Sequence, residues 1–69
     1  MNLAIELEQE DDGRWIAEIN ELNGVLVYGE TREEAILKVK TLALRVVADR
    51  LESGEGLPKQ FESLVFEAV

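Results

Sequence analysis

The sequence contains neither cysteine nor histidine among its 69 residues. Without cysteine no disulfide can form, and without either residue a typical zinc site has no ligands. The same absence removes two common catalytic bases and nucleophiles. The acidic pairs Asp11-Asp12 and Glu33-Glu34 have structural explanations, the first in a turn and the second at a helix start, where negative charge is favourable. We therefore expect neither an enzyme nor a bound cofactor.

Basic residues are also scarce, with seven against fifteen acidic ones and a net charge of −8. Proteins that bind nucleic acid draw much of their affinity from Lys and Arg on phosphates, so this balance argues against direct nucleic-acid binding. Residues 1–30 hold eight acids and one base, Arg14, which gives −7 for this half. Such a field steers a basic partner toward the protein. The alternative interpretation is that the acid serves solubility.

Long apolar runs and signal-peptide features are lacking as well. No segment approaches the ~20 apolar residues that cross a membrane, and the N-terminus has no basic region followed by an apolar stretch. A cytoplasmic protein is expected. The chain makes one domain, residues 1–69, and it must offset about 100 kcal/mol of ordering entropy without disulfide or metal. Self-association is therefore expected.

Two strands joined by a tight turn are predicted at the N-terminus. Residues 2–9 alternate between apolar and polar side chains, as do the residues after Arg14, and this is typical of strands with one buried face. Asp12-Gly13 between them is a strong hairpin signal. The residues expected on the buried face are Leu3, Ile5, Leu7, Trp15, Ala17 and Ile19.

A second turn at Asn23-Gly24 leads into a third strand, residues 25–28. Both faces of this strand are apolar, so the sequence leaves open which residues point toward the core. The three strands form an antiparallel meander.

A helix is predicted from about Arg32 to about Ser53, with Gly54 just past its end. Thr31-Arg32-Glu33-Glu34 is a capping box, in which the Thr31 hydroxyl can accept from the Glu34 amide and the Glu34 carboxylate can reach back.

The predicted helix is too long and too broadly apolar for one small sheet. At 1.5 Å per residue it spans ~33 Å, and its apolar arc exceeds the ~100° stripe of a simple surface helix. We expect another chain to cover part of the arc, at Leu37, Leu44 and Leu51. The alternative is that the C-terminal segment of the same chain folds over these leucines.

The residues after the helix predict a flexible connection over 53–58 and a last strand from Phe61 to Val69, with Leu64, Val65 and Phe66 at its centre. Parallel pairing with the first strand places it on the open edge of the sheet. The expected fold is α+β, in the order β-β-β-α-β, with a mixed four-stranded sheet of order 3-2-1-4 and one long helix on one face.

Two segments carry a family resemblance: Asp12 to Val25 and Tyr28 to Ala35. They resemble the HicB-like antitoxins of bacterial toxin–antitoxin systems, whose pattern is D-G-x-aromatic-x-A, then P-E-L-P-G-C, then G-x-T-x-x-E-A. Asn20 and Asn23 stand where prolines are usual, and Val25 stands where cysteine is common. The matching positions are Asp12, Gly13, Trp15, Ala17, Glu21, Leu22, Gly24, Gly29, Thr31, Glu34 and Ala35.

The resemblance implies a partial ribonuclease H-like fold without the carboxylate set of that enzyme family. It also implies a non-enzymatic antitoxin that neutralises a small basic, mRNA-cleaving toxin of the HicA-like kind, encoded nearby. Many members carry an additional C-terminal DNA-binding domain, and this sequence gives no sign of one. The acidic first half suits such a toxin. The residues expected to face it are Glu6, Glu8, Asp11, Asp12 and Glu18.

Two other functions stay open at this point. The chain could be an orphan stand-alone oligomeric domain with a scaffold role or an unrelated binding partner. It could also be a metal-dependent nuclease if Glu6, Glu8 and Glu18 held a divalent ion across the first hairpin. A solvated acidic face explains the same three residues without any metal.

Overall fold

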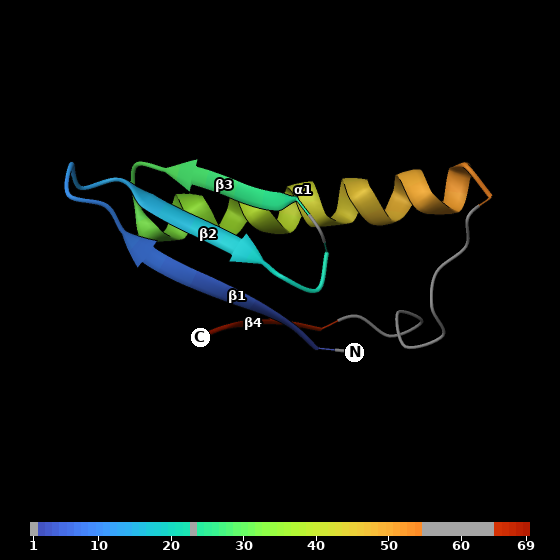
Figure 1. Cartoon of the computed structure of the whole chain (residues 1–69), viewed down its shortest axis with the longest axis horizontal. Coiled ribbons are helices and arrows are strands. Elements are labelled where there is room, and N and C mark those ends of the chain that lie inside the picture. The colour runs from blue at the N-terminus through green and yellow to red at the C-terminus, as the bar shows by residue number, and fades with distance from the viewer. Residues whose placement is uncertain (1, 23, 55–64) are drawn as a thin grey trace.

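The computed structural model describes residues 2–22, 24–54 and 65–69. The elements in this part of the chain are β1 Asn2–Gln9, β2 Trp15–Ile19, β3 Val25–Gly29, α1 Arg32–Glu52 and β4 Val65–Ala68. The strands form one mixed sheet in the order β3-β2-β1-β4, in which only the β1–β4 pair is parallel (Figure 1). The predicted α+β fold and its sheet order are therefore confirmed.

The turn between β1 and β2 lies where the sequence predicts it. Gly13 has a φ of +91°, a conformation that glycine adopts at no steric cost. Its amide donates to the Glu10 carbonyl at 2.9 Å, and the Glu10 amide donates to the Arg14 carbonyl at 2.7 Å. This closure sets the register in which Leu7 lies opposite Ala17, so both apolar residues point to the same face.

The described core lies between α1 and one face of the sheet. The helix contributes a row of residues four apart, which is the spacing of one helical face, and the strands contribute alternate residues. The buried apolar residues are Leu3, Ile5, Ala17, Ile19, Leu22, Val25, Ala35, Val39, Ala43 and Val47. Leu7 and Trp15, predicted on this face, are half-buried and pack against the core.

Leu22 is a core residue that the periodicity did not indicate. It lies in the loop between β2 and β3 and is fully buried. Its amide donates to the Ile19 carbonyl at 3.3 Å, and its carbonyl accepts from the Val25 amide at 3.2 Å. These two hydrogen bonds turn the chain back into the core, so the loop contributes a packed side chain.

The structure settles the face of β3 that the sequence left open. Val25 is buried and Val27 half-buried on the helix side, whereas Leu26 and Tyr28 are 41% and 43% exposed on the other side. Gly29 continues the helix-facing series next to the start of α1. A Cβ atom at Gly29 would lie 2.6 Å from the Ala35 nitrogen, so only glycine allows the helix to approach this closely.

The N-terminus of α1 is capped by Thr31 as predicted, with one difference. The Thr31 hydroxyl accepts from the Glu34 amide at 3.0 Å. The Glu34 carboxylate reaches back one residue further than in a standard capping box and accepts from the Glu30 amide at 3.2 Å. At the other end the helix stops at Glu52, with Ser53 as its C-cap and Gly54 at a φ of +79°.

The final strand is described only in part. β4 begins at Val65, so residues 61–64 of the predicted Phe61–Val69 strand, including Leu64, lie outside the described residues. The same holds for residues 55–58 of the predicted connection. The Val69 amide donates to the Ile5 carbonyl at 3.0 Å, which extends the parallel ladder beyond Ala68.

α1 is longer than the sheet that it covers. Its 21 residues span ~32 Å, against ~17 Å for a five-residue strand. The helix packs chiefly on β3 and β2, and its later turns extend past the ends of both strands (Figure 1). One helix therefore closes one face of the sheet and leaves its own outer side without a neighbour among the described residues.

Replacing the N-cap tests how the helix start is held. Thr31→Ala removes the acceptor for the Glu34 amide, and we expect the free energy of unfolding to fall by about 1 kcal/mol. The matched control is Thr41→Ala, because the Thr41 hydroxyl donates only to the Leu37 carbonyl within the helix at 2.9 Å. Urea denaturation should show a loss for Thr31→Ala alone; equal losses would contradict the capping role.

Candidate binding surface on the open face of the sheet

The face of the sheet opposite α1 has no second layer among the described residues. Alternation along each strand and the register between paired strands together determine which side chains point to it. We call this surface the open face. Its members are Asn2, Ala4, Glu6, Glu8, Ile16, Glu18, Leu26, Tyr28, Val65 and Glu67.

The centre of the open face is acidic because of the β1–β2 register. Glu6 lies directly opposite Glu18, and Glu8 follows Glu6 on the same side of β1. Like charges directly opposite each other on neighbouring strands destabilise a sheet. Within the described part of the chain, the one side-chain hydrogen bond to these three residues comes from the Asn20 amide, which donates to the Glu6 carboxylate. The sheet thus keeps an electrostatically unfavourable pair on its exposed side.

The acidic centre is hollowed and bordered by apolar side chains. A shallow depression of about 310 Å³ is lined by Glu6, Leu7, Glu8, Ile16 and Glu18. Toward the β3 edge the open face becomes apolar, with Leu26 and Tyr28 exposed. A partner on this face would therefore meet carboxylates and apolar area together.

The two aspartates predicted to face a partner lie at the β1–β2 turn, next to the open face. The Asp12 carboxylate accepts from the Arg14 amide at 3.0 Å and from Arg14 Nε at 2.8 Å. The Arg14 guanidinium carbon also lies 4.8 Å from the centre of the Tyr28 ring, within the range of a cation–π contact. Asp12 therefore has a structural partner, and these contacts do not involve Asp11.

The Asp12 contacts change its acidity. The hydrogen bond from the Arg14 amide, followed by the one from its side chain, lowers the pKa of Asp12 below the usual 3.8. In return, the carboxylate raises the pKa of the Arg14 guanidinium. Both groups stay charged over the whole physiological pH range.

A second ion pair lies beside the outer edge of β3, which pairs with no other strand among the described residues. Lys38 Nζ lies 3.0 Å from the Glu34 carboxylate and donates to the Tyr28 carbonyl at 3.3 Å. A lysine at this position covers part of an unpaired strand edge, which discourages uncontrolled strand pairing. The Lys38 side chain, followed by the Glu30 amide, lowers the pKa of Glu34 below the usual 4.5.

The three leucines predicted for a subunit interface are exposed on α1. The exposed fractions of Leu37, Leu44 and Leu51 are 66%, 52% and 58%. The alternative that the chain's own C-terminal segment covers them is not seen among the described residues, where β4 lies beside β1. Their stripe is a second surface, separate from the open face.

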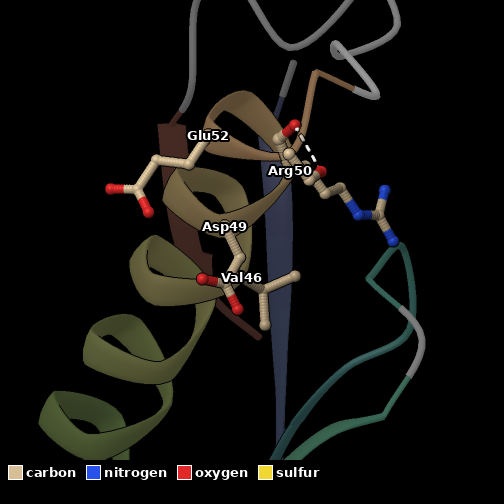
Figure 2. A pocket seen from close by; sticks show the side chains of 5 residues that line it. Val46, Asp49, Arg50 and Glu52 are labelled. Carbon is tan, nitrogen blue, oxygen red and sulfur yellow. Dashed lines mark hydrogen bonds between the residues drawn. The ribbon is translucent and has the colours of Figure 1, made fainter.

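Another hollow, larger than the depression on the open face, lies at the C-terminal end of α1, and the sequence does not indicate it. It measures about 580 Å³ and is lined by Val46, Asp49, Arg50, Glu52 and Ser53. Figure 2 shows the Arg50 and Glu52 side chains pointing in opposite directions. The Ser53 hydroxyl donates to the Arg50 carbonyl at 3.1 Å, so it serves the helix terminus. This arrangement brings no acid–base pair together.

The described residues lack a candidate metal centre. They contain no group of three or more His, Cys, Asp or Glu side chains that could hold a metal ion. The idea of a divalent ion between Glu6, Glu8 and Glu18 is therefore wrong for this arrangement, although β pairing does bring the three carboxylates to one face. In the same part of the chain, α1 lacks the apolar length needed to span a bilayer.

The lowered pKa values predict a loss of stability in acid. Asp12 and Glu34 ionise more readily when folded, so their stabilisation is complete above their unfolded pKa values and is lost as pH falls through the folded ones. Carboxyl ¹³C NMR titration should show that Arg14→Gln raises the pKa of Asp12 alone and Lys38→Gln that of Glu34 alone. If neither midpoint moves, the two contacts do not persist in solution.

No family model, curated protein or solved structure matches this chain. The resemblance to HicB-like antitoxins therefore rests on the sequence pattern alone and stays a prediction. What the chain binds has to be inferred from the charge and shape of its surfaces.

Proposed function

We propose that this chain is a non-enzymatic binding protein, a HicB-like antitoxin domain that neutralises a small basic, mRNA-cleaving toxin in the cytoplasm. The toxin would lie against the open face, with Glu6, Glu8 and Glu18 at the centre of the contact. Asp11 and the Arg14-paired Asp12 would border it at the β1–β2 turn. The sheet order is compatible with the partial ribonuclease H-like fold of that family.

The observation that carries the proposal is the direct pairing of Glu6 with Glu18 on the open face. Two carboxylates in this register cost the free protein stability. A lysine or arginine placed between them would turn the repulsion into attraction. Binding of a basic partner would therefore be favoured by the relief of a repulsion that the free chain carries. The surrounding negative field would also speed the encounter of such a partner.

The apolar part of the open face supports a protein partner over a small cation. Ile16 is half-buried, and Leu26 and Tyr28 are 41% and 43% exposed. Protein interfaces combine apolar area, often with an aromatic anchor, with a polar or charged border. Tyr28 would be that anchor, and the Arg14 guanidinium already packs on its ring.

A second candidate function is an orphan oligomeric domain with a scaffold role. The observation in its favour is the exposed stripe of Leu37, Leu44 and Leu51. A neighbouring gene for a short basic protein with a double-stranded-RNA-binding fold favours the antitoxin function. Its absence favours the scaffold.

Charge reversal on the open face tests the antitoxin proposal. The variant Glu6→Lys/Glu8→Lys/Glu18→Lys should weaken binding of the purified basic toxin at least about tenfold, or ~1.4 kcal/mol, and flatten its salt dependence. The matched control, Glu30→Lys/Glu33→Lys/Asp49→Lys, makes the same charge change at exposed positions outside the open face. Isothermal titration calorimetry would measure both. Equal affinities for the two variants would rule out the open face as the toxin site.

A further inference from the structure

The exposed side of α1 carries a regular apolar seam. Leu37, Leu44 and Leu51 recur every seven residues, and the smaller Thr41 and Ala48 lie between them at spacings of three and four. All five are exposed. Spacings of three and four along a helix are those of the seam between two packed helices. The buried row from Ala35 to Val47 lies on another side of the helix, so α1 is apolar on two sides.

We propose that a second copy of this chain covers the seam, with the two α1 helices antiparallel and a two-fold axis at Leu44. Leu44 would then pack on Leu44 of the second copy, and Leu37 on its Leu51. Thr41 would lie next to Ala48 of the second copy. A two-fold interface must be complementary to itself, and leucines placed seven residues on either side of Leu44 meet this requirement.

The polar atoms of the seam are already satisfied. Thr41 is its one polar residue, and its hydroxyl donates to the Leu37 carbonyl at 2.9 Å. Burying an unpaired hydroxyl would be costly, whereas Thr41 can present its methyl group and enter an interface without leaving a donor unsatisfied.

The charge distribution favours α1 over the sheet as the contact between copies. α1 holds five basic and four acidic residues, a net charge of +1, whereas the whole chain carries −8. Two open faces would repel each other, but two helices near neutrality would not. The antiparallel arrangement also brings Lys38 to the same flank as Glu52 of the second copy, and it leaves both acidic faces on the outside of the dimer.

The length of the seam sets the expected strength. From Leu37 to Leu51 it spans ~21 Å. A contact of this length buries less surface than the ~1,200 Å² that specific, stable interfaces bury. The dimer should therefore be reversible. Because its contact is apolar and its subunits are both acidic, added salt should strengthen it.

Analytical ultracentrifugation over a roughly hundredfold range of protein concentration tests self-association. The wild-type mass should rise from 7.8 kDa toward twice that value. Leu44→Glu places two carboxylates at the two-fold axis. It should raise the protein concentration at which half of the chains are dimeric at least tenfold. The matched control is Leu26→Glu, a similarly exposed leucine on the open face, and it should still dimerise. A wild type that stays monomeric, or loss of the dimer in Leu26→Glu alone, would overturn the proposal.

Cysteine cross-linking tests the direction of the helices, because the chain has no cysteine of its own. In the antiparallel dimer, oxidised Leu44→Cys links to itself. Single variants Leu37→Cys and Leu51→Cys link efficiently only when the two are mixed. Circular dichroism confirms that each variant is folded. If Leu37→Cys and Leu51→Cys each link to themselves and not to one another, the helices are parallel and the proposed axis is wrong.

Discussion

A single helix can cover only one face of a four-stranded sheet, and this constraint determines most of the surface of the protein. On the helix side, alternate strand residues such as Leu3, Ile5 and Ala17 are buried. On the other side, the same alternation exposes Glu6, Glu8 and Glu18 together. The acidic open face therefore follows from the way the core is built, because the register that buries Leu7 opposite Ala17 also pairs Glu6 with Glu18.

The same constraint explains the second surface. α1 is about twice as long as the strands beneath it, and it has apolar residues on two sides. The side that packs on the sheet has small residues, which let the helix come close to the strands, as where Ala35 lies against Gly29. The outer side has no layer above it among the described residues. The two surfaces differ in chemistry, since one is acidic with an aromatic border and the other is apolar on a nearly neutral helix. We expect them to serve different partners.

Much of the fold could be predicted from the sequence because its local signals agree with one another. Alternation along residues 2–9, the Asp12-Gly13 turn and the Thr31 cap each set one element, and short connections limited the sheet order. The face of β3 could not be predicted, since both sides are apolar and the choice depends on where α1 lies over Gly29. Leu22 was missed as a core residue because a loop residue has no periodicity.

For the candidate site, the sequence predicted which carboxylates share a face but not which side chains each of them contacts. Alternation places Glu6 and Glu8 on one face of β1, and the hairpin pairing with β2 adds Glu18 to that face. The pairing of Asp12 with Arg14, and the contact of Arg14 with Tyr28, depend on side-chain conformations that the turn allows but does not specify.

The most direct test of two separate surfaces is a ¹H–¹⁵N NMR titration of the labelled chain with its basic partner, compared with dilution of the chain alone. The partner should shift amides on β1 and β2 around Glu6 and Glu18. Dilution should shift amides of α1 between Leu37 and Leu51. If the partner and dilution perturb the same residues, one surface serves both partner binding and self-association, and the assignment of two separate surfaces is wrong.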